Sequence, residues 1–316
     1  MQRCLVTGAS GFIGRHLCKH LQQQGLQVRA WLRQASEGSW QESIMGDLQA
    51  IGSDQTLNES CAGIDTLFHL GAIAHTRAVS DADYWAMNVG VTEALMQLAI
   101  RAGVSRVIYF SSVKAIDPDD AYGRSKQAAA QLVLDLGARY GLHVCVLEPS
   151  LVYGIPLKGH LLSLLRAIDQ GWFLPIPETH NQRSMISVQD LVVVACLLAQ
   201  DSRSNGKTYV VSDGVPYSNR QIVDAMRAAL SLKPIGAAVP LSLLRAMARV
   251  GDCLGHISPF SIPFNTVLLE KLLGSAYYPA YELEKDFDWK PSVHLWQSLP
   301  SIVQHYQDTK KKSETL

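Results

Sequence analysis

The sequence predicts an α/β fold: a doubly wound parallel sheet followed by a smaller, mostly helical C-terminal domain. Two observations support this prediction. In the first half of the chain, short runs rich in β-branched and aromatic residues alternate with helix-like stretches, a pattern typical of parallel strands joined by helices. After Gly154, prolines divide the chain into short segments, as expected for a domain of short helices and loops.

The expected elements set the domain boundaries. Strand-like runs lie at 4–6, 28–32, 66–70, 107–110 and 143–147, with a further one at 209–211. The clearest helix-like stretches lie at 13–24, 81–102 and 122–140. We therefore expect residues 1–155 to form the first domain, rejoined by parts of 185–215, and residues 156–316 to form most of the second.

The composition is that of an ordinary globular chain. Of its 316 residues, 28 are Lys or Arg and 28 are Asp or Glu, so no strong overall field directs the protein to nucleic acid or to a membrane surface. Six scattered cysteines without metal-ligand spacing predict reduced thiols, no metal site and a cytoplasmic protein. The longest uncharged run, 253–269, contains two prolines and is too short for an integral membrane segment. Two amphipathic stretches, 241–254 and 262–273, are expected to be core helices rather than membrane-surface helices.

A glycine-rich loop follows the first expected strand, where residues 7–14 read TGASGFIG. Gly8 permits a tight turn, Gly11 lets the backbone approach a pyrophosphate, and Gly14 lets the next helix pack closely on the strand. The N–H groups at the start of that helix would then bind the phosphates. Glycines are common in ordinary turns, but in this position they predict a Rossmann-type dinucleotide-binding domain.

The end of the second strand indicates which dinucleotide binds. An acidic residue there would hydrogen-bond the adenosine 2′-hydroxyl of NAD, whereas an arginine suits the 2′-phosphate of NADP. This chain has Leu32 and Arg33 at that point, and no acidic residue before Glu37. We therefore favour NADP, with NAD as the alternative; the simpler interpretation of Arg33 is a solvent-exposed arginine at a strand end.

A serine, a tyrosine and a lysine form the candidate catalytic set. The run 107–110 ends in Ser111 and Ser112, and Tyr122 and Lys126 follow at the start of a helix, four residues apart and therefore on one face. An ammonium group beside a phenol lowers the pKa of the phenol, so Tyr122 could exchange a proton with a substrate oxygen while a nicotinamide exchanges hydride. Ser112 would hold the same oxygen, with Ser111 as the alternative.

These motifs and the chain length resemble the extended short-chain dehydrogenase/reductase family, also called the NAD-dependent epimerase/dehydratase family. Further segments at 45–48, 69–72, 88–89, 149–154 and 183–191 extend the likeness over nearly the whole chain. The sequences SSVK at 111–114 and LKGH at 157–160 most resemble the subgroup around UDP-glucose 4-epimerase, which includes bacterial reductases of UDP-4-keto-6-deoxy-HexNAc.

The resemblance implies a set of binding residues and a possible homodimer. It places Ser112, His160 and Arg183 at the substrate, with Arg183 on the diphosphate. Together with the glycine loop and Arg33, which the residues themselves indicate, the complete set expected at the cofactor is Gly8, Ser10, Gly11, Phe12, Ile13, Gly14, Arg33, Asp47, Leu48, Leu70, Gly71, Ala72, Tyr122, Lys126, Pro149 and Val152.

The chain also departs from the family pattern. The ten-residue spacing from Ser112 to Tyr122 is shorter than usual, Glu148 stands where the family often has arginine, and His160 stands where it often has asparagine. Arg183 could form a salt bridge with Asp190 or Glu178 instead of binding phosphate. The run 172–175 could pack against a uracil ring or belong to the core.

The sequence therefore predicts an NAD(P)-dependent enzyme acting at C4 of a UDP-hexose or UDP-HexNAc. A 4-keto-sugar reductase is favoured, because Arg33 favours NADPH and cellular reductions generally use it. The alternatives are a UDP-glucose or UDP-GlcNAc 4-epimerase, a dehydrogenase of a non-sugar ketone or alcohol, and a non-catalytic dinucleotide sensor. The sequence does not specify the sugar or the oligomeric state.

Overall fold

The computed structural model describes residues 1–54, 57, 59–73, 80–173, 175–236, 238–257 and 265–314. The chain divides into two compact units, which we describe separately. The first comprises Met1–Val152, Val188–Ser212 and Ala280–Ser292, and the second comprises Tyr153–Ser187, Asp213–Pro279 and Val293–Leu316. The segment Ala280–Ser292 of the first unit was not anticipated from the sequence.

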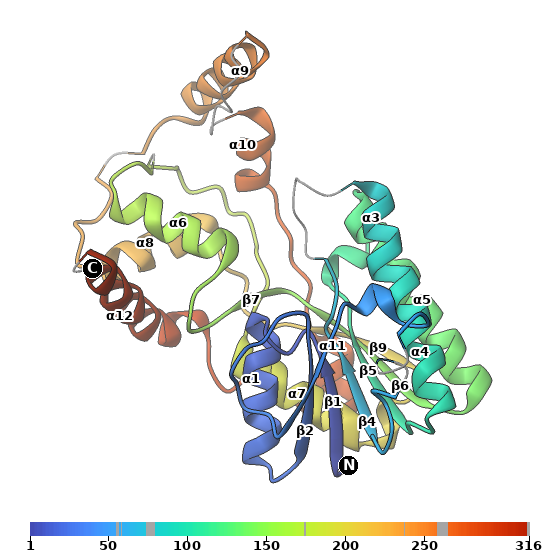
Figure 1. The fold of residues 1–316 in the computed structure, drawn as a ribbon. Helices are drawn as coiled ribbons and strands as arrows, with labels where there is room; N and C mark the ends of the chain where they lie inside the picture. Colours follow the sequence, from blue (N-terminus) through green and yellow to red (C-terminus); the bar gives the residue numbers. More distant parts are fainter. Residues whose placement is uncertain are drawn as a thin grey trace. The chain divides into compact units, whose positions relative to one another are not determined.

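The first unit is built on a sheet of seven parallel strands, which confirms the α/β prediction (Figure 1). The strand order is β3-β2-β1-β4-β5-β6-β9. The strands are β1 (Arg3–Thr7), β2 (Gln27–Leu32), β3 (Glu42–Met45), β4 (Thr66–His69), β5 (Arg106–Phe110), β6 (His143–Pro149) and β9 (Lys207–Val211). The prediction missed β3, because this short edge strand alternates between half-buried and exposed positions and lacks an apolar run.

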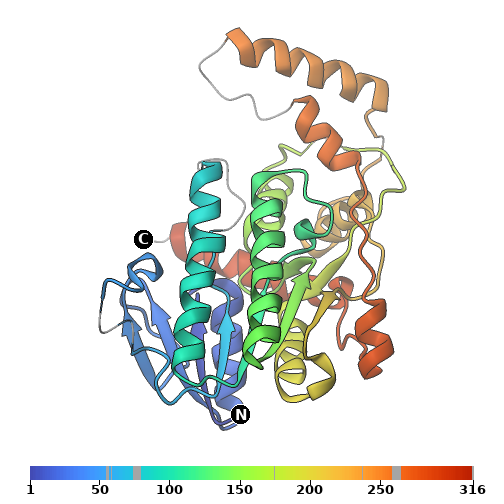
Figure 2. The same cartoon turned by 90° about the vertical axis from the view of Figure 1, so that its right-hand side faces the viewer.

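Helices cover both faces of this sheet (Figures 1 and 2). On one face, α1 (Phe12–Gln23) packs beside α7 (Val188–Gln200). On the other face, α4 (Val91–Arg101) packs beside α5 (Ala121–Tyr140), and buried side chains of both helices join those of the strands in one apolar core. Short 3-10 turns connect the elements at η1 (Leu48–Ala50), η3 (Val113–Ala115) and η4 (Ser202–Ser204).

The stretch predicted as one helix over 81–102 contains a π-helical turn. It consists of α3 (Asp81–Trp85), the π-helix η2 (Ala86–Gly90) and α4. A Ser80–Asp83 capping box starts α3, because each of these side chains accepts a hydrogen bond from the other residue's backbone N–H. The π turn contains the buried Asn88, and such turns are frequent at functional sites.

The strand order places a binding crevice in the first unit. The chain runs outward from β1 to β2 and β3, and then returns to β4 on the other side of β1. In open parallel sheets ligands bind at the carboxyl ends of the strands, where the strand order reverses. The glycine loop at 8–11 follows β1 and therefore lies at this point.

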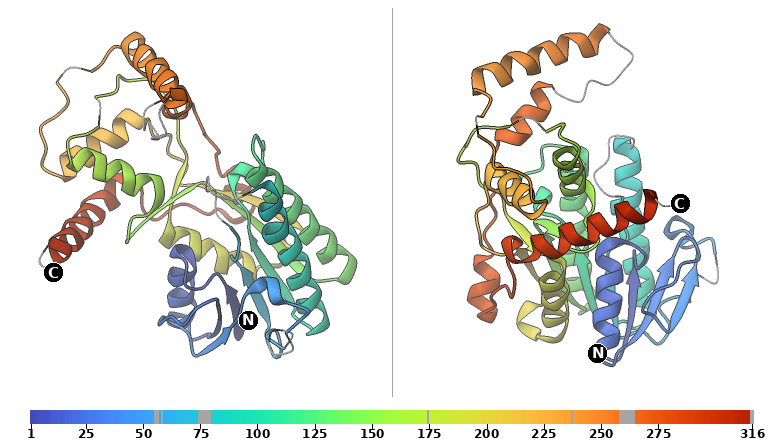
Figure 3. Two further views of the ribbon diagram at one scale, coloured as in Figure 1. Left: turned by 45° about the horizontal axis from the view of Figure 1, so that its top comes forward. Right: turned by 90° about the vertical axis from the view of Figure 1, so that its left-hand side faces the viewer.

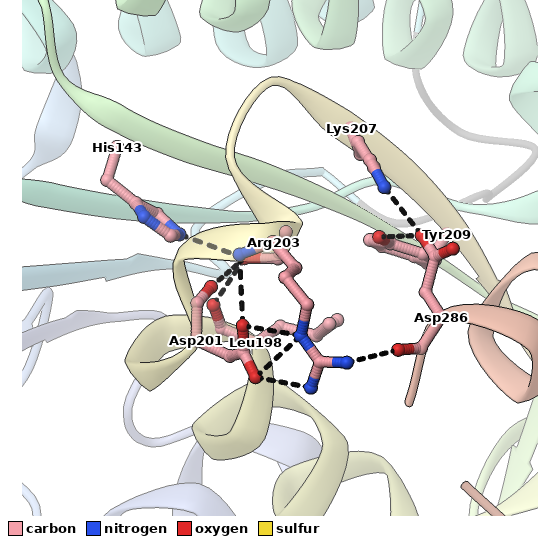
Figure 4. Close-up of polar contacts among 8 residues, drawn as sticks. His143, Leu198, Asp201, Arg203, Lys207, Tyr209 and Asp286 are labelled. Carbon is pink, nitrogen blue, oxygen red and sulfur yellow. Dashed lines mark hydrogen bonds and ion pairs between the residues drawn. The ribbon is translucent and has the colours of Figure 1, made fainter. Parts of the chain in front are cut away.

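A polar cluster joins the segment Ala280–Ser292 to the amino ends of β6 and β9 (Figure 4). The carboxylate of Asp286, in α11 (Tyr281–Phe287), accepts hydrogen bonds from Lys207 at 2.6 Å and from the Tyr209 hydroxyl at 2.7 Å. Arg203 donates to the backbone carbonyl of Asp286 at 2.7 Å and lies 4.6 Å from the centroid of the Phe287 ring. These contacts lie at the edge of the sheet opposite the crevice, so we assign the cluster to the scaffold.

The second unit is mostly helical. It has its own apolar core, to which α6, α8, α9, α10 and α12 all contribute. Figure 3 shows α6, α8 and α12 grouped together, with α9 beside α10. The helices are α6 (Gly159–Asp169), α8 (Asn219–Ala229), α9 (Leu241–Ile257), α10 (Thr266–Leu273) and α12 (Leu295–Glu314); the short strands are β7 (Leu151–Tyr153), at the passage from the first unit, and β8 (Met185–Ser187).

The amphipathic stretches form helices with one buried face. In α9, Leu244 and Ala248 belong to the core, whereas Leu243, Met247 and Val250 are exposed. Within the described ranges, no helix combines the length and the apolar character needed to cross a bilayer. All six cysteines are free thiols, and all except Cys253 are buried.

The close packing of α1 on the glycine loop yields the first prediction. A Cβ atom at Gly14 would lie 2.2 Å from the carbonyl oxygen of Gly8 and 2.8 Å from the Cα of Ala9. Because backbone must move to accommodate it, we expect Gly14→Ala to lower the free energy of unfolding by about 3 kcal/mol, as measured by urea denaturation. The control is Gly90→Ala, where the nearest atom is 4.0 Å away and the helical backbone suits alanine. Equal stability of the two variants would contradict the prediction.

Candidate active site

The glycine loop has the geometry of a phosphate cradle. Gly8 adopts a φ of 68°, and a Cβ there would lie 3.0 Å from the carbonyl group of Leu70. Gly11 caps α1 without a side-chain hydrogen bond, so the first N–H groups of the helix point outward from a bare backbone turn. The cradle that these missing side chains leave fits a dinucleotide pyrophosphate.

The other residues predicted at the cofactor follow the neighbouring strands. Leu70 and Gly71 come directly after β4, and their N–H groups donate to the Thr7 hydroxyl at 3.1 and 2.9 Å. Asp47 follows β3 and caps η1 by accepting from the N–H of Gln49 at 3.0 Å. Arg33 is exposed at the end of β2. The structure thus gathers these residues along one edge of the sheet.

Arg15 is a residue of this edge that the sequence reasoning missed. Its guanidinium donates to the carbonyl of Ser10 at 3.0 Å, to the carbonyl of Glu37 at 2.7 Å and to the hydroxyl of Ser36 at 2.6 Å. It therefore ties the glycine loop to the segment after β2, next to Arg33. Its position in the first turn of α1, next to Gly14, is the sequence feature that could have identified it.

A buried chain of hydrogen bonds connects the glycine loop to α4. His69, at the end of β4, contacts the Thr7 hydroxyl through Nδ1 at 2.7 Å and the Thr92 hydroxyl through Nε2 at 2.9 Å. The Thr7 hydroxyl already accepts two backbone N–H groups, so we assign it as the donor to Nδ1. Nε2–H then donates to Thr92, which donates to the carbonyl of Asn88 at 2.7 Å. Burial lowers the pKa of His69 to about 3, so the imidazole is neutral. The sequence offers neither His69 nor His75 a metal-ligand partner, which favours a structural role for both; His75 lies outside the described residues.

Asn88 extends this chain to the candidate catalytic helix. Its side-chain amide donates to the Ser125 hydroxyl at 2.9 Å, and that hydroxyl donates to the carbonyl of Tyr122 at 2.8 Å. Its side-chain oxygen accepts from the N–H of Ile73 at 3.0 Å. Asn88 therefore holds the start of α5 against the segment that follows β4.

Ser112 and Tyr122 lie together where β5 ends and α5 begins. The Asp120 carboxylate caps α5 by accepting from the N–H of Gly123 at 2.7 Å. Burial raises the pKa of Tyr122, and its hydrogen bond with the Ser112 side chain opposes this rise. The ring of Tyr84 packs edge-on against Tyr122 at 5.7 Å. Among the described residues, the Ser111 hydroxyl has no hydrogen-bond partner, so the geometry supports Ser112 as the partner of Tyr122.

Lys126 differs from the expectation. We expected its ammonium to lower the pKa of Tyr122, but the pKa of that phenol is raised, and Lys126 is not among the groups that shift it. The Lys126 Nζ instead donates to the carbonyl of Phe110 at 2.5 Å and lies 4.3 Å from the centroid of the Tyr109 ring. The side chain is almost completely buried, and this burial lowers its own pKa to about 7.

Two of the residues predicted at the substrate, Arg183 and His160, belong to the second unit. Arg183 is half-buried, and its backbone pairs with Tyr217 through hydrogen bonds of 2.8 and 3.0 Å. Burial lowers the pKa of Arg183, and Tyr278 opposes this effect. His160 is exposed in the first turn of α6.

The two acids suggested as partners of Arg183 have other contacts. The Asp190 carboxylate accepts hydrogen bonds from the N–H and the hydroxyl of Ser292, and Glu178 accepts one from the Ser218 hydroxyl at 3.3 Å. In the described part of the chain, no group of three or more His, Cys, Asp or Glu side chains could hold a metal ion.

Comparisons with known proteins agree with this geometry. Residues 4–212 match the model of the NAD dependent epimerase/dehydratase family. A UDP-glucose 4-epimerase from Vibrio cholerae is 24% identical, over 96% of this chain and 94% of its own length. A 4-hydroxy-2-methyl-3-oxo-4-farnesyl-3,4-dihydroquinoline-1-oxide ketoreductase from Stigmatella aurantiaca is 28% identical over 80% of both chains.

A solved structure supports the same fold. MoeE5 in complex with UDP-glucose and NAD superposes with a TM-score of 0.76 at 24% sequence identity. The match covers 97% of this chain and 99% of MoeE5. At this identity the likeness establishes the fold and leaves the substrate to be argued from the site.

The burial of Lys126 predicts a pH-dependent stability. Because its pKa of about 7 lies below the usual 10.5, the unfolded chain binds more protons between these values, so this group makes folding more favourable as the pH rises. We expect the stability difference between wild type and Lys126→Met, from urea denaturation, to grow by about 3 kcal/mol in favour of wild type between pH 7 and 9.5. Lys19→Met, at an exposed position of α1, is the control. Parallel pH curves for wild type and Lys126→Met would contradict this account.

Proposed function

The chain belongs to the NAD dependent epimerase/dehydratase family, and on that premise we propose that it is an NADPH-dependent reductase of a 4-keto UDP-sugar. The observation that carries this proposal is the placement of Tyr122 and Ser112 at the carboxyl edge of the sheet, in the same unit as the glycine cradle. A phenol and a hydroxyl in this position can hold a carbonyl oxygen and supply its proton.

The chemistry assigned to this chain is a single proton transfer. The nicotinamide, when bound, supplies a hydride to the C4 carbon. Tyr122 donates its phenolic proton to O4, so the C=O double bond becomes a C–O single bond bearing a hydroxyl. The Ser112 hydroxyl holds O4 during this step. A phenol whose pKa is raised by burial stays protonated at neutral pH, which suits reduction.

Lys126 fits a positioning role more closely than the acidifying role that we expected. Its ammonium donates to the carbonyl of Phe110, directly before Ser111 and Ser112. It therefore fixes the end of β5 from the same helix that carries Tyr122. In the family that the chain resembles, this lysine also holds the nicotinamide ribose, and its remaining N–H donors are suited to a ribose hydroxyl.

Arg183 supports an anionic substrate. A half-buried guanidinium loses hydration, and a bidentate phosphate is the partner that best compensates this loss. The diphosphate of a UDP-sugar offers such a partner, in agreement with the name of the Vibrio cholerae relative. We assign His160 to the same substrate, as an exposed contact at the start of α6.

Two arginines support NADP over NAD. Arg33 directly follows β2, and Arg15 hydrogen-bonds residues 36–37 a few positions further along the chain. A 2′-phosphate on the adenosine ribose would approach these two positive charges. NAD is the alternative, as the dinucleotide named with MoeE5.

Two other functions have specific support. A UDP-sugar 4-epimerase would use the same residues, and the Vibrio cholerae relative is named UDP-glucose 4-epimerase. A reductase of a non-sugar ketone is favoured by the Stigmatella aurantiaca relative, which has the higher identity. A non-catalytic dinucleotide sensor has less support, because Ser112, Tyr122 and Lys126 are all present.

Tyr122→Phe tests the catalytic assignment. Removing the hydroxyl removes the proton donor, so we expect kcat on a UDP-4-keto-6-deoxy-HexNAc to fall at least about 100-fold, while the variant still binds NADPH. Tyr140→Phe, at an exposed position of the same helix, is the matched control. Turnover by Tyr122→Phe at the wild-type rate would refute the role of Tyr122.

Arg183→Ala tests the substrate class. Loss of the phosphate ligand should raise KM for the UDP-sugar about 10- to 100-fold and weaken inhibition by UDP equally, because both ligands carry the diphosphate. Arg249→Ala, an exposed arginine of the same unit, is the control. An unchanged KM, together with turnover of an uncharged ketone by wild type, would favour the non-sugar reductase instead.

A further inference from the structure

Ser111 and Glu148 are two buried polar side chains that the proposed mechanism does not use. They occupy adjacent positions on neighbouring strands, because Phe110 of β5 is paired with Leu147 of β6 and the N–H of Ser111 donates to the carbonyl of Leu147 at 2.7 Å. Adjacent strands lie about 4.8 Å apart, so the two side chains leave the sheet side by side. By the alternation of the strands, both lie on the face that carries Tyr109 and Val146, the face covered by α4 and α5.

Neither side chain has its hydrogen bonds satisfied by the described residues. Ser111 is 6% exposed and Glu148 is 8% exposed. In the part of the chain that the structure describes, the Ser111 hydroxyl has no partner, and no hydrogen bond or ion pair of the Glu148 carboxyl group is found. A buried polar group without a partner typically costs about 1–3 kcal/mol of stability. A buried hydroxyl without a partner beside a largely buried carboxyl group indicates a site whose partners come from a ligand.

The pair lies next to the candidate catalytic residues. Ser111 directly precedes Ser112, and the carbonyl of Phe110, one residue earlier, accepts the hydrogen bond of Lys126. Pro149, predicted at the cofactor, directly follows Glu148. Along the chain, the pair therefore lies within one residue of groups assigned to the substrate carbonyl and to the cofactor.

We propose that Ser111 and Glu148 form a hydrogen-bonding subsite for an uncharged hydroxyl or amide group of the bound ligand. This inference rests on the proposed function. A hydroxyl or amide can both donate and accept, which matches a serine beside a carboxyl group. Burial raises the pKa of Glu148 to about 7, so near neutral pH the carboxyl group also exists in a form that donates a hydrogen bond. A phosphate is unsuitable here, because a carboxylate would repel it.

The replacement at position 148 gives the subsite its specificity. The family that the chain resembles often has arginine there, which would select a negatively charged or purely accepting group. Glutamate reverses this selection toward groups that bear an O–H or N–H. Such groups occur on the sugar, as hydroxyls or an acetamide, and on the nicotinamide, as its carboxamide; the two sources are distinguished by experiment.

Glu148→Leu and Glu148→Gln separate a ligand-binding role from a structural one. Leucine fills the buried position without a polar group, so we expect Glu148→Leu to raise the Tm by a few degrees while it impairs ligand binding about tenfold or more. Glutamine keeps a donor and an acceptor, so Glu148→Gln should restore most of the binding. Ser111→Ala should impair the same ligand as Glu148→Leu. The matched control is Thr66→Val, which removes another buried hydroxyl that has no partner among the described residues, at the opposite end of the strands.

Two measurements identify the ligand. The Kd for NADPH, from fluorescence titration, rises if the subsite holds the carboxamide; the KM or calorimetric Kd for the UDP-sugar rises alone if it holds a sugar group. The inference is overturned if Glu148→Leu and Ser111→Ala bind both ligands as wild type does. If wild type itself neither binds nor turns over any UDP-sugar, the proposed function fails, and the NADPH titration alone decides the subsite.

Discussion

The first unit depends on a buried, neutral histidine at the carboxyl end of β4. His69 is fully buried and bridges the Thr7 and Thr92 hydroxyls, and Thr92 continues the chain of hydrogen bonds to Asn88. In this hydrogen-bond network each hydroxyl and each ring nitrogen has one role toward its neighbour, as donor or as acceptor. These roles fix the tautomer of His69 and the relative positions of β1, β4 and α4. Since Asn88 also holds the start of α5 through Ser125, the cradle and the candidate catalytic residues are positioned by one continuous network.

The amino and carboxyl ends of the strands have different roles, because the polar residues there make different contacts. At the amino edge, Asp286 satisfies Lys207 and Tyr209, and Ser204 satisfies His143, so the polar groups there hold the returning segment in place. At the carboxyl ends, the Ser111 hydroxyl and the Glu148 carboxyl group are buried without such partners among the described residues. Hydrogen-bonded groups at the amino ends of the strands stabilise the fold, whereas buried groups left without partners beside the candidate catalytic residues can bind a ligand.

Local spacing explains what the sequence could predict. The glycine loop and the pair Tyr122 and Lys126 each lie within a few residues, so their geometry follows from one turn and one helix. Other features join residues that are far apart in the sequence or depend on burial. They are the contacts of Arg15 with the segment 36–37, the return of 280–292 to the first unit, and the hydrogen bond of Lys126 to Phe110. Hydrophobic periodicity carries no signal for such contacts, and the expected effect of Lys126 on the pKa of Tyr122 failed because the spacing of the pair does not specify where the ammonium points.

The burial of two ionisable groups at the candidate site has an electrostatic cost, and this cost indicates what the groups do. Lys126 and Glu148 are both buried, and burial shifts the pKa of each toward 7, from above and from below. Each group therefore destabilises the folded chain in its charged form, and neither would be retained for stability alone. Lys126 compensates part of this cost through Phe110 and Tyr109, whereas in the described chain Glu148 has no such contact. This difference supports a positioning role for Lys126 at the end of β5 and a ligand-binding role for Glu148.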